Sequence, residues 1–192
     1  MITSYLTKNL YINTIIVILI FILDRFSKIY VMNLDKVNYS SQLYQSKYLN
    51  ISLVWNEGIA FGLLSFNQDN LYNLLSLLIA TIVLIIFFMI IRNNNIKKYP
   101  LLMIFAGAIG NLYDRVAYKA VPDFIDFHVG DFHWFIFNVA DIFISLGVFF
   151  MILIELIDVI FYIILFGLDR MIRINIIYFL FTITWQQYLL LL

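Results

Sequence analysis

The chain contains no cysteine, which excludes disulfide bonds, thiolate catalysis and cysteine-ligated metals. Charge is also scarce, since 12% of the 192 residues are charged, against about a quarter in a typical soluble domain. The net charge is zero, so no nucleic acid is expected as a partner. The two histidines, His128 and His133, lie five residues apart, whereas a helical metal-binding pair is spaced at four with a third ligand nearby. We therefore expect no metal and no cofactor.

Hydrophobic residues, in contrast, make up 64% of the chain. This is far more apolar side chain than one soluble core of this size could bury. The composition therefore predicts an all-α integral membrane protein.

The apolar runs predict a bundle of four transmembrane helices, at about residues 10–32, 71–91, 100–113 and 138–158. The first run follows Lys8 and resembles a signal peptide, but no small-residue cleavage site follows it. In the third run, Ala106 and Gly110 have the spacing that lets another helix approach closely. Between the first two helices, residues 48–55 are rich in β-branched and aromatic residues and predict a small extracytoplasmic β-structure. Residues 116–137 predict a mixed connection whose aromatic residues suit an interfacial belt.

The loop from Arg92 to Lys98 holds three basic residues and no acid, which predicts that it lies in the cytoplasm. Both termini of a four-helix chain then lie inside. Several polar residues fall together at the outer face: Asp24, Asn56, Asp114, Asp123 and Asp141. We divide the chain into a membrane domain, residues 1–158, and an apolar extension, residues 159–192, which is either a surface helix or a fifth span.

The stretch from Gly107 to Asp141 contains five aspartates, and such a cluster at a membrane edge indicates a functional site. Pro122 disfavours a helix just before Asp123, whereas Asp141 falls in the first turn of the fourth span. The chain can thus bring both carboxylates to one depth. Two close carboxylates share a proton, so that one acts as general base and the other as general acid. Such a pair can hydrolyse a peptide bond without metal, serine or cysteine.

Structural alternatives exist for each of these residues. Asn138 and Asp141 are also a typical helix start, in which an N-cap residue is followed by an acid near the helix dipole. Asp114 next to Arg115 is a candidate structural ion pair at a helix end, and Asp126 is the main rival of Asp123. The NEGIAFG stretch at residues 56–62 has the composition of an ordinary turn after a strand.

Five blocks together resemble lipoprotein signal peptidase (signal peptidase II), a family of bacterial inner-membrane aspartic peptidases with four membrane helices. They are Asp24 with Lys28, NEGIAFG at Asn56–Gly62, GNLYDR at Gly110–Arg115, VPDFID at Val121–Asp126 and FNVAD at Phe137–Asp141. The resemblance covers about Leu10 to Asp158. The chain departs from the family at Pro122, where another residue type is usual, and in its long apolar tail.

The resemblance implies that Asp123 and Asp141 are the catalytic dyad. It also implies a set of residues that support the site or bind substrate: Asp24, Lys28, Asn56, Gly58, Asn111, Arg115 and Asn138. The implied substrate is a prolipoprotein that carries diacylglycerol on a cysteine and is cut just before that cysteine. Membrane lipid is the other expected partner, and we expect a monomer.

Two functions of other classes compete with this prediction. A small proton-coupled carrier could use the same acids, but it predicts an internal repeat and acids near mid-membrane. The sequence shows no repeat, and its acids lie at the ends of the spans. A non-catalytic membrane scaffold would need no converging acids.

Overall fold

A computed structural model describes residues 2–38, 42–58, 69–93 and 95–166, together with residues 175, 178 and 179. These residues form four long helices, α1 (Ile2–Asn38), α2 (Asp69–Arg92), α3 (Lys98–Tyr118) and α4 (Val139–Phe166). Four strands, β1 (Gln42–Gln45), β2 (Leu49–Asn56), β3 (Val121–Val129) and β4 (Phe132–Phe137), form one antiparallel sheet in that order. The protein is therefore mostly helical with a small antiparallel sheet.

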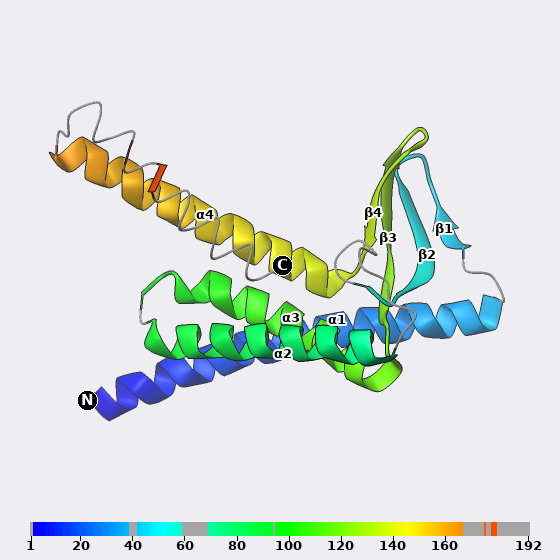
Figure 1. Cartoon of the computed structure of the whole chain (residues 1–192), viewed down its shortest axis with the longest axis horizontal. Coiled ribbons are helices and arrows are strands. Elements are labelled where there is room, and N and C mark those ends of the chain that lie inside the picture. Colours follow the sequence, from blue (N-terminus) through cyan, green and yellow to red (C-terminus); the bar gives the residue numbers. More distant parts are fainter. Residues whose placement is uncertain are drawn as a thin grey trace.

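Helix α3 lies at the centre of the bundle and packs against α1, α2 and α4 (Figure 1). The predicted close approach at Ala106 and Gly110 is confirmed, because Ala106 is fully buried and Gly110 faces both α1 and α4. A Cβ on Gly110 would lie 2.6 Å from Asp24 Oδ2, and one on Gly107 would lie 2.5 Å from the Ala140 carbonyl oxygen. The small residues of α3 therefore allow α1 and α4 to approach it closely, near Asp24 and Ala140.

The sheet stands at the end of the helices where α4 begins (Figure 1). The predicted strand at residues 48–55 is confirmed as β2. The prediction of a mixed connection at residues 116–137 is wrong, because this segment forms β3 and β4 and supplies the other half of the sheet. Strand β4 has four consecutive exposed residues and no clear alternation, so the periodicity that identifies a half-buried strand is missing there.

The helices are longer than predicted. Helix α1 continues to Asn38 and α4 to Phe166, and α3 passes its charged residues before it ends at Tyr118. Asp24, Lys28 and Asp114 do not end these helices, because they are buried and form ion pairs within the helix bundle. Residues 59–62 of the NEGIAFG stretch and almost all of the tail after residue 166 lie outside the described residues.

Within the described part of the chain, two helices are long and apolar enough to cross a membrane by themselves, Tyr72–Arg92 in α2 and Val139–Ile163 in α4. The charge-free runs of α1 and α3 are shorter than that of α2 and end at Asp24 and Asp114, and four spans remain a prediction. Large apolar side chains nevertheless cover the outer surface of the helices, including Phe26 of α1, which is 70% exposed. An exposed apolar surface of this extent is typical of a membrane or protein interface.

Candidate active site

Asp123 lies near the start of β3, opposite Val54 of β2. The preceding Pro122 pairs with Trp55 of β2, while the pairing of β3 with β4 begins only at Ile125. The missing N–H of Pro122 is tolerated here because one side of the strand has no partner strand at this point. The prediction that Pro122 excludes a helix is confirmed, and the strand directs the Asp123 side chain into a cavity.

Asp141 lies in the first turn of α4, as predicted. Asn138 caps this helix, because its Oδ1 accepts a hydrogen bond from the Asp141 backbone N–H at 3.1 Å. In return, the Asn138 backbone N–H donates to Asp141 Oδ2 at 3.1 Å, which completes a reciprocal capping box. From α3, Asn111 Nδ2 donates to Asp141 Oδ1 at 2.8 Å. Both oxygens of this carboxylate are therefore fixed.

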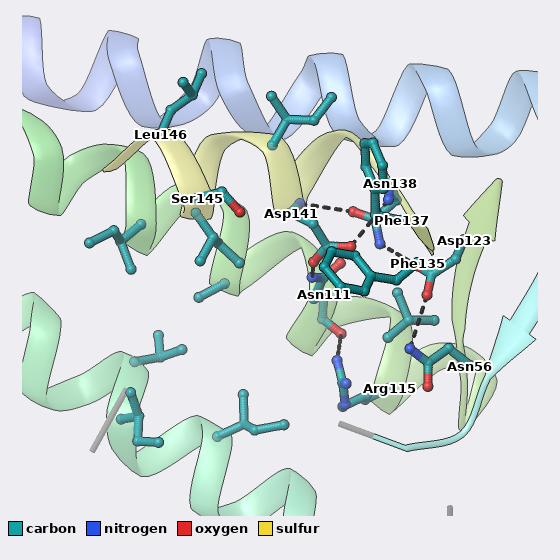
Figure 2. A pocket seen from close by; sticks show the side chains of 18 of the residues that line it. Asn56, Asn111, Arg115, Asp123, Phe135, Phe137, Asn138, Asp141, Ser145 and Leu146 are labelled. Carbon is teal, nitrogen blue, oxygen red and sulfur yellow. Dashed lines mark hydrogen bonds between the residues drawn. The ribbon is translucent and has the colours of Figure 1, made fainter. Parts of the chain in front are cut away.

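Asn138 also joins the two acids (Figure 2). Its Nδ2 donates to Asp123 Oδ1 at 2.6 Å, and Asn56 Nδ2 donates to Asp123 Oδ2 at 2.9 Å. Asn56 is oriented in turn by the Gly58 N–H, which donates to Asn56 Oδ1 at 2.9 Å. The helix-cap interpretation and the site interpretation are thus compatible, since the cap residue is also the link between the carboxyl groups.

The electrostatics of the pair favour a shared proton. Asp123 is 4% exposed, and this burial, followed by the nearby charge of Asp141, raises the pKa of Asp123 to about 7. Amide donation by Asn56 and Asn138 acts in the opposite direction and lowers this pKa. The pKa of Asp123 therefore lies near neutral pH, which suits a residue that takes up and releases a proton in general acid–base chemistry.

Arg115 lies beside the acids on α3 and is buried. Its guanidinium donates to the Gly58 carbonyl at 2.9 Å and to the Asn111 carbonyl at 3.2 Å. The predicted ion pair between Asp114 and Arg115 is not what the described residues form, because Asp114 faces α1. Neighbouring positions on a helix point in different directions, so adjacency in sequence does not by itself predict an ion pair.

Four charged side chains form a group with no net charge next to the site. Fully buried Asp24 and Lys28 of α1 form an ion pair at 2.9 Å, and Lys28 Nζ lies 2.7 Å from Asp114 Oδ2. Arg25 completes the group through contacts with Asp114 and with Asp24, the latter at 2.7 Å. Two acids and two cations balance, as buried charges require.

This charged group connects to Asp141 through Asn111. Lys28 Nζ donates to Asn111 Oδ1 at 2.8 Å, and the other end of the same amide donates to Asp141. Asp24 Oδ1 accepts the Ala140 backbone N–H at 3.1 Å, which anchors the first turn of α4. Asp24 and Lys28 therefore position the site without lining its cavity.

Asp126 is the alternative to Asp123 as the second catalytic acid, but its side chain does not reach the cavity. Its carboxylate contacts His133 Nδ1 at 2.9 Å and Asn50 Nδ2 at 3.3 Å, and it does not line the cavity. Residues three apart on a strand point to opposite faces, so only one of the two acids can face Asp141. The structure brings Asp123 and not Asp126 to Asp141.

The acids occupy the polar end of a cavity of about 400 Å³. Its polar lining consists of Asn56, Asn111, Arg115, Asp123, Asn138 and Asp141 with Ser145, and the rest is mainly aliphatic side chains of α2, α3 and α4. Strand β4 adds Trp134, Phe135 and Phe137, which sequence analysis assigned to an interfacial belt and missed as cavity lining. The arrangement can hold an apolar chain with one polar bond beside the acids.

Comparisons with known proteins agree with this site. A family model described as signal peptidase (SPase) II matches residues 16–157. The chain is 50% identical over 149 residues to a lipoprotein signal peptidase of Pelagibacter ubique (strain HTCC1062), and the match covers 78% of this chain and 90% of that protein. It is 36% identical over 138 residues to a lipoprotein signal peptidase of Anaplasma phagocytophilum (strain HZ), where the match covers 71% and 86%.

A solved structure is also similar. It is a bacterial membrane enzyme determined by the in meso method at 2.3 Å resolution, with a TM-score of 0.62 and 27% identity. The similarity covers 76% of this chain and 87% of that one. The family match at residues 16–157 includes every residue of the site described above.

Proposed function

This chain belongs to the signal peptidase II family, and we propose that it is an aspartic endopeptidase whose dyad is Asp123 and Asp141. The family membership confirms the resemblance predicted from the sequence and makes the chain a bacterial membrane protease that cleaves the signal peptides of lipoproteins. The matches support this peptidase function and not the proton-coupled carrier. The observation that carries the aspartic assignment is the bridge that Asn138 makes between the carboxyl groups of Asp123 and Asp141.

In the proposed reaction the two carboxyl groups share one proton. The ionised carboxylate removes a proton from water, whose oxygen attacks the carbonyl carbon of the scissile bond. The protonated carboxyl polarises the carbonyl oxygen and then donates its proton to the leaving amine as the C–N bond breaks. Water is split between the products, and the pair again holds one proton. Asn56, Asn111 and Asn138 keep the carboxyl groups in place throughout.

The substrate assignment follows from the family, and the polarity of the cavity supports it. Aliphatic residues from α2, α3 and α4 surround one polar end. This combination suits a scissile bond flanked by the apolar segment of a signal peptide and by acyl chains. We assign as substrate a prolipoprotein with diacylglycerol on its cysteine, cut just before that cysteine. We also propose that the enzyme acts as a monomer.

For the membrane arrangement, α1 and α3 cross the bilayer together with α2 and α4. Their charges do not oppose this, because Asp24, Arg25, Lys28 and Asp114 satisfy one another inside the bundle. The basic loop between α2 and α3 and both termini then lie in the cytoplasm. The sheet and the dyad lie at the extracytoplasmic face of the inner membrane, beside membrane lipid.

The test is cleavage of a diacylglyceryl-modified prolipoprotein by the purified full chain. We expect Asp123→Asn and Asp141→Asn each to lower the rate by about 10²–10⁴-fold, the usual contribution of a general acid or base. Asp126→Asn is the matched control, an acid on the same strand that faces away from the cavity, and it should retain cleavage. If both dyad variants are folded and still cleave at the wild-type rate, the aspartic mechanism is wrong.

A further inference from the structure

The β3–β4 hairpin brings three potential metal ligands together outside the dyad. Asp126, His128 and His133 each offer an oxygen or nitrogen atom, and these atoms all lie within 4.8 Å of one another. His128 and His133 are cross-strand partners, and their rings stack with centroids 5.0 Å apart. The pairing follows from a two-residue loop whose first residue, Gly130, has a φ of +60°, as a type II′ hairpin turn requires.

Within this cluster, one nitrogen atom makes no hydrogen bond in the described part of the chain. His133 Nδ1 lies 2.9 Å from Asp126 Oδ2, while His128 Nδ1 is buried and has no hydrogen-bond partner in the described part of the chain. A buried nitrogen without a partner carries a desolvation penalty, which a metal bond would remove. On the other side of Asp126, Asn50 Nδ2 donates to the carboxylate at 3.3 Å from the paired position on β2.

We propose that Asp126, His128 and His133 form a binding site for a divalent transition-metal ion of the zinc class. Two imidazoles and one carboxylate are a donor set that suits such ions, with water completing the coordination. The His133 side chain is 52% exposed, so the site has an entry path for the ion. Asn50 would orient Asp126 through its hydrogen bond to the carboxylate, as hydrogen-bond partners of metal ligands do.

The expectation of no metal site came from a helical spacing rule, and that rule does not apply here. A spacing of five residues is unsuitable on a helix, but across a two-residue hairpin loop it places the two histidines directly opposite each other. The third ligand comes from Asp126, two positions before His128 on β3, where side chains share a face.

Metal binding at this position would join β3 to β4. The residue after His133 is Trp134, which begins the aromatic wall of the cavity, and Phe135 and Phe137 follow on the same strand. The ion would therefore stabilise the strand that lines the cavity, at a distance from the dyad. This consequence requires no metal in the peptide-bond chemistry.

The experiment titrates Zn²⁺ into the tag-free, detergent-solubilised full chain and measures both calorimetric binding and the thermal unfolding midpoint. We expect one bound Zn²⁺ per chain and a midpoint that rises with its concentration. His128→Ala and His133→Ala should each weaken binding by at least about tenfold, and Asn50→Ala by about 10–100-fold. Because neither measurement uses substrate, its result is independent of the proposed peptidase activity.

Matched controls decide the location of the site. Asp126→Asn should lose binding, whereas Asp131→Asn, an exposed acid in the same hairpin loop, should keep it. Mg²⁺ should not shift the midpoint, because it prefers oxygen ligands. The His133 side chain is half exposed, so His133→Ala should fold like wild type. The proposal is overturned if wild type does not bind Zn²⁺, or if His133→Ala binds it as tightly as wild type.

Discussion

Asn138 donates its side-chain amide to Asp123 at 2.6 Å from its position as the cap of the helix that carries Asp141. One residue therefore sets both where α4 begins and how its first acid faces the strand acid. This dual role makes the two contributions separable by mutation. A cap needs only a side-chain oxygen, whereas the link to Asp123 needs a donor that reaches as far as the Asn138 amide nitrogen, one atom beyond a serine hydroxyl.

We predict that Asn138→Ser and Asn138→Ala differ in stability but not in activity. Serine retains helix capping, so Asn138→Ser should unfold near the wild-type temperature, while Asn138→Ala should lose about 0.5–2 kcal/mol. Both lose the hydrogen bond to Asp123, so both should cleave a lipid-modified prolipoprotein at least about tenfold more slowly. Thermal unfolding and cleavage rates of the two variants check this. Wild-type activity in Asn138→Ser would show that the cap alone matters.

The pH dependence of cleavage follows from the shared proton. The pKa of Asp123 is raised to about 7 by burial and by Asp141, so the protonated form is lost as the pH rises through 7. We expect the alkaline limb of the kcat/KM profile, which reports groups of the free enzyme, to fall with an apparent pKa near this value. Asn56→Ala removes an amide that lowers this pKa, so its alkaline limb should shift to higher pH. Profiles of kcat/KM against pH for the two proteins measure the shift, and a shift downward would contradict it.

The same pKa gives a signed prediction for stability. In the unfolded chain Asp123 ionises at about its ordinary value of 3.8, whereas the folded protein holds the proton up to about 7. The folded state thus binds more protons in this interval, so the contribution of Asp123 to folding becomes less favourable as the pH rises from about 4 to 7. We expect Asp123→Asn, which cannot ionise, to gain thermal stability relative to wild type between pH 5 and pH 8. Unfolding midpoints at the two values test this, with Asp126→Asn as the comparison.

Much of the site could be predicted from the sequence, because its residues lie at recognisable chain features. Asp123 follows a proline and Asp141 follows a helix cap, and both features have local signatures. The partners of Asp114 could not be predicted, because they lie on α1, far away in sequence. Strands β3 and β4 were not predicted for a similar reason, because β3 is defined by its pairing with β2 rather than by its own sequence pattern.

In the β3–β4 hairpin, the sequence spacing was judged against the wrong secondary structure. His128 and His133 appeared poorly spaced because the spacing rule assumed a helix. Once residues 121–137 are known to form two strands around a two-residue loop, the same spacing places the side chains opposite each other. Secondary structure therefore decides which sequence distances matter.

The last prediction concerns the buried charges behind the dyad. Lys28→Met should leave Asp24 and Asp114 with one cation, Arg25, for two buried carboxylates. Removing one partner from a buried ion pair typically costs about 3–5 kcal/mol, because the remaining charge stays uncompensated. The matched control is Lys97→Met, because Lys97 also contacts two acids, Glu155 and Asp158, but lies in a partly exposed position at the other end of the bundle.

Exposed ion pairs contribute about 0–1 kcal/mol, so Lys97→Met should unfold near the wild-type temperature while Lys28→Met unfolds well below it. Because Lys28 also holds Asn111, which donates to Asp141, its loss should lower kcat even at temperatures where the variant remains folded. Replacing Asp24 with Asn in the Lys28→Met variant restores the charge balance and should recover part of the stability. Equal unfolding temperatures for the two lysine variants would show that the buried group does not stabilise the bundle.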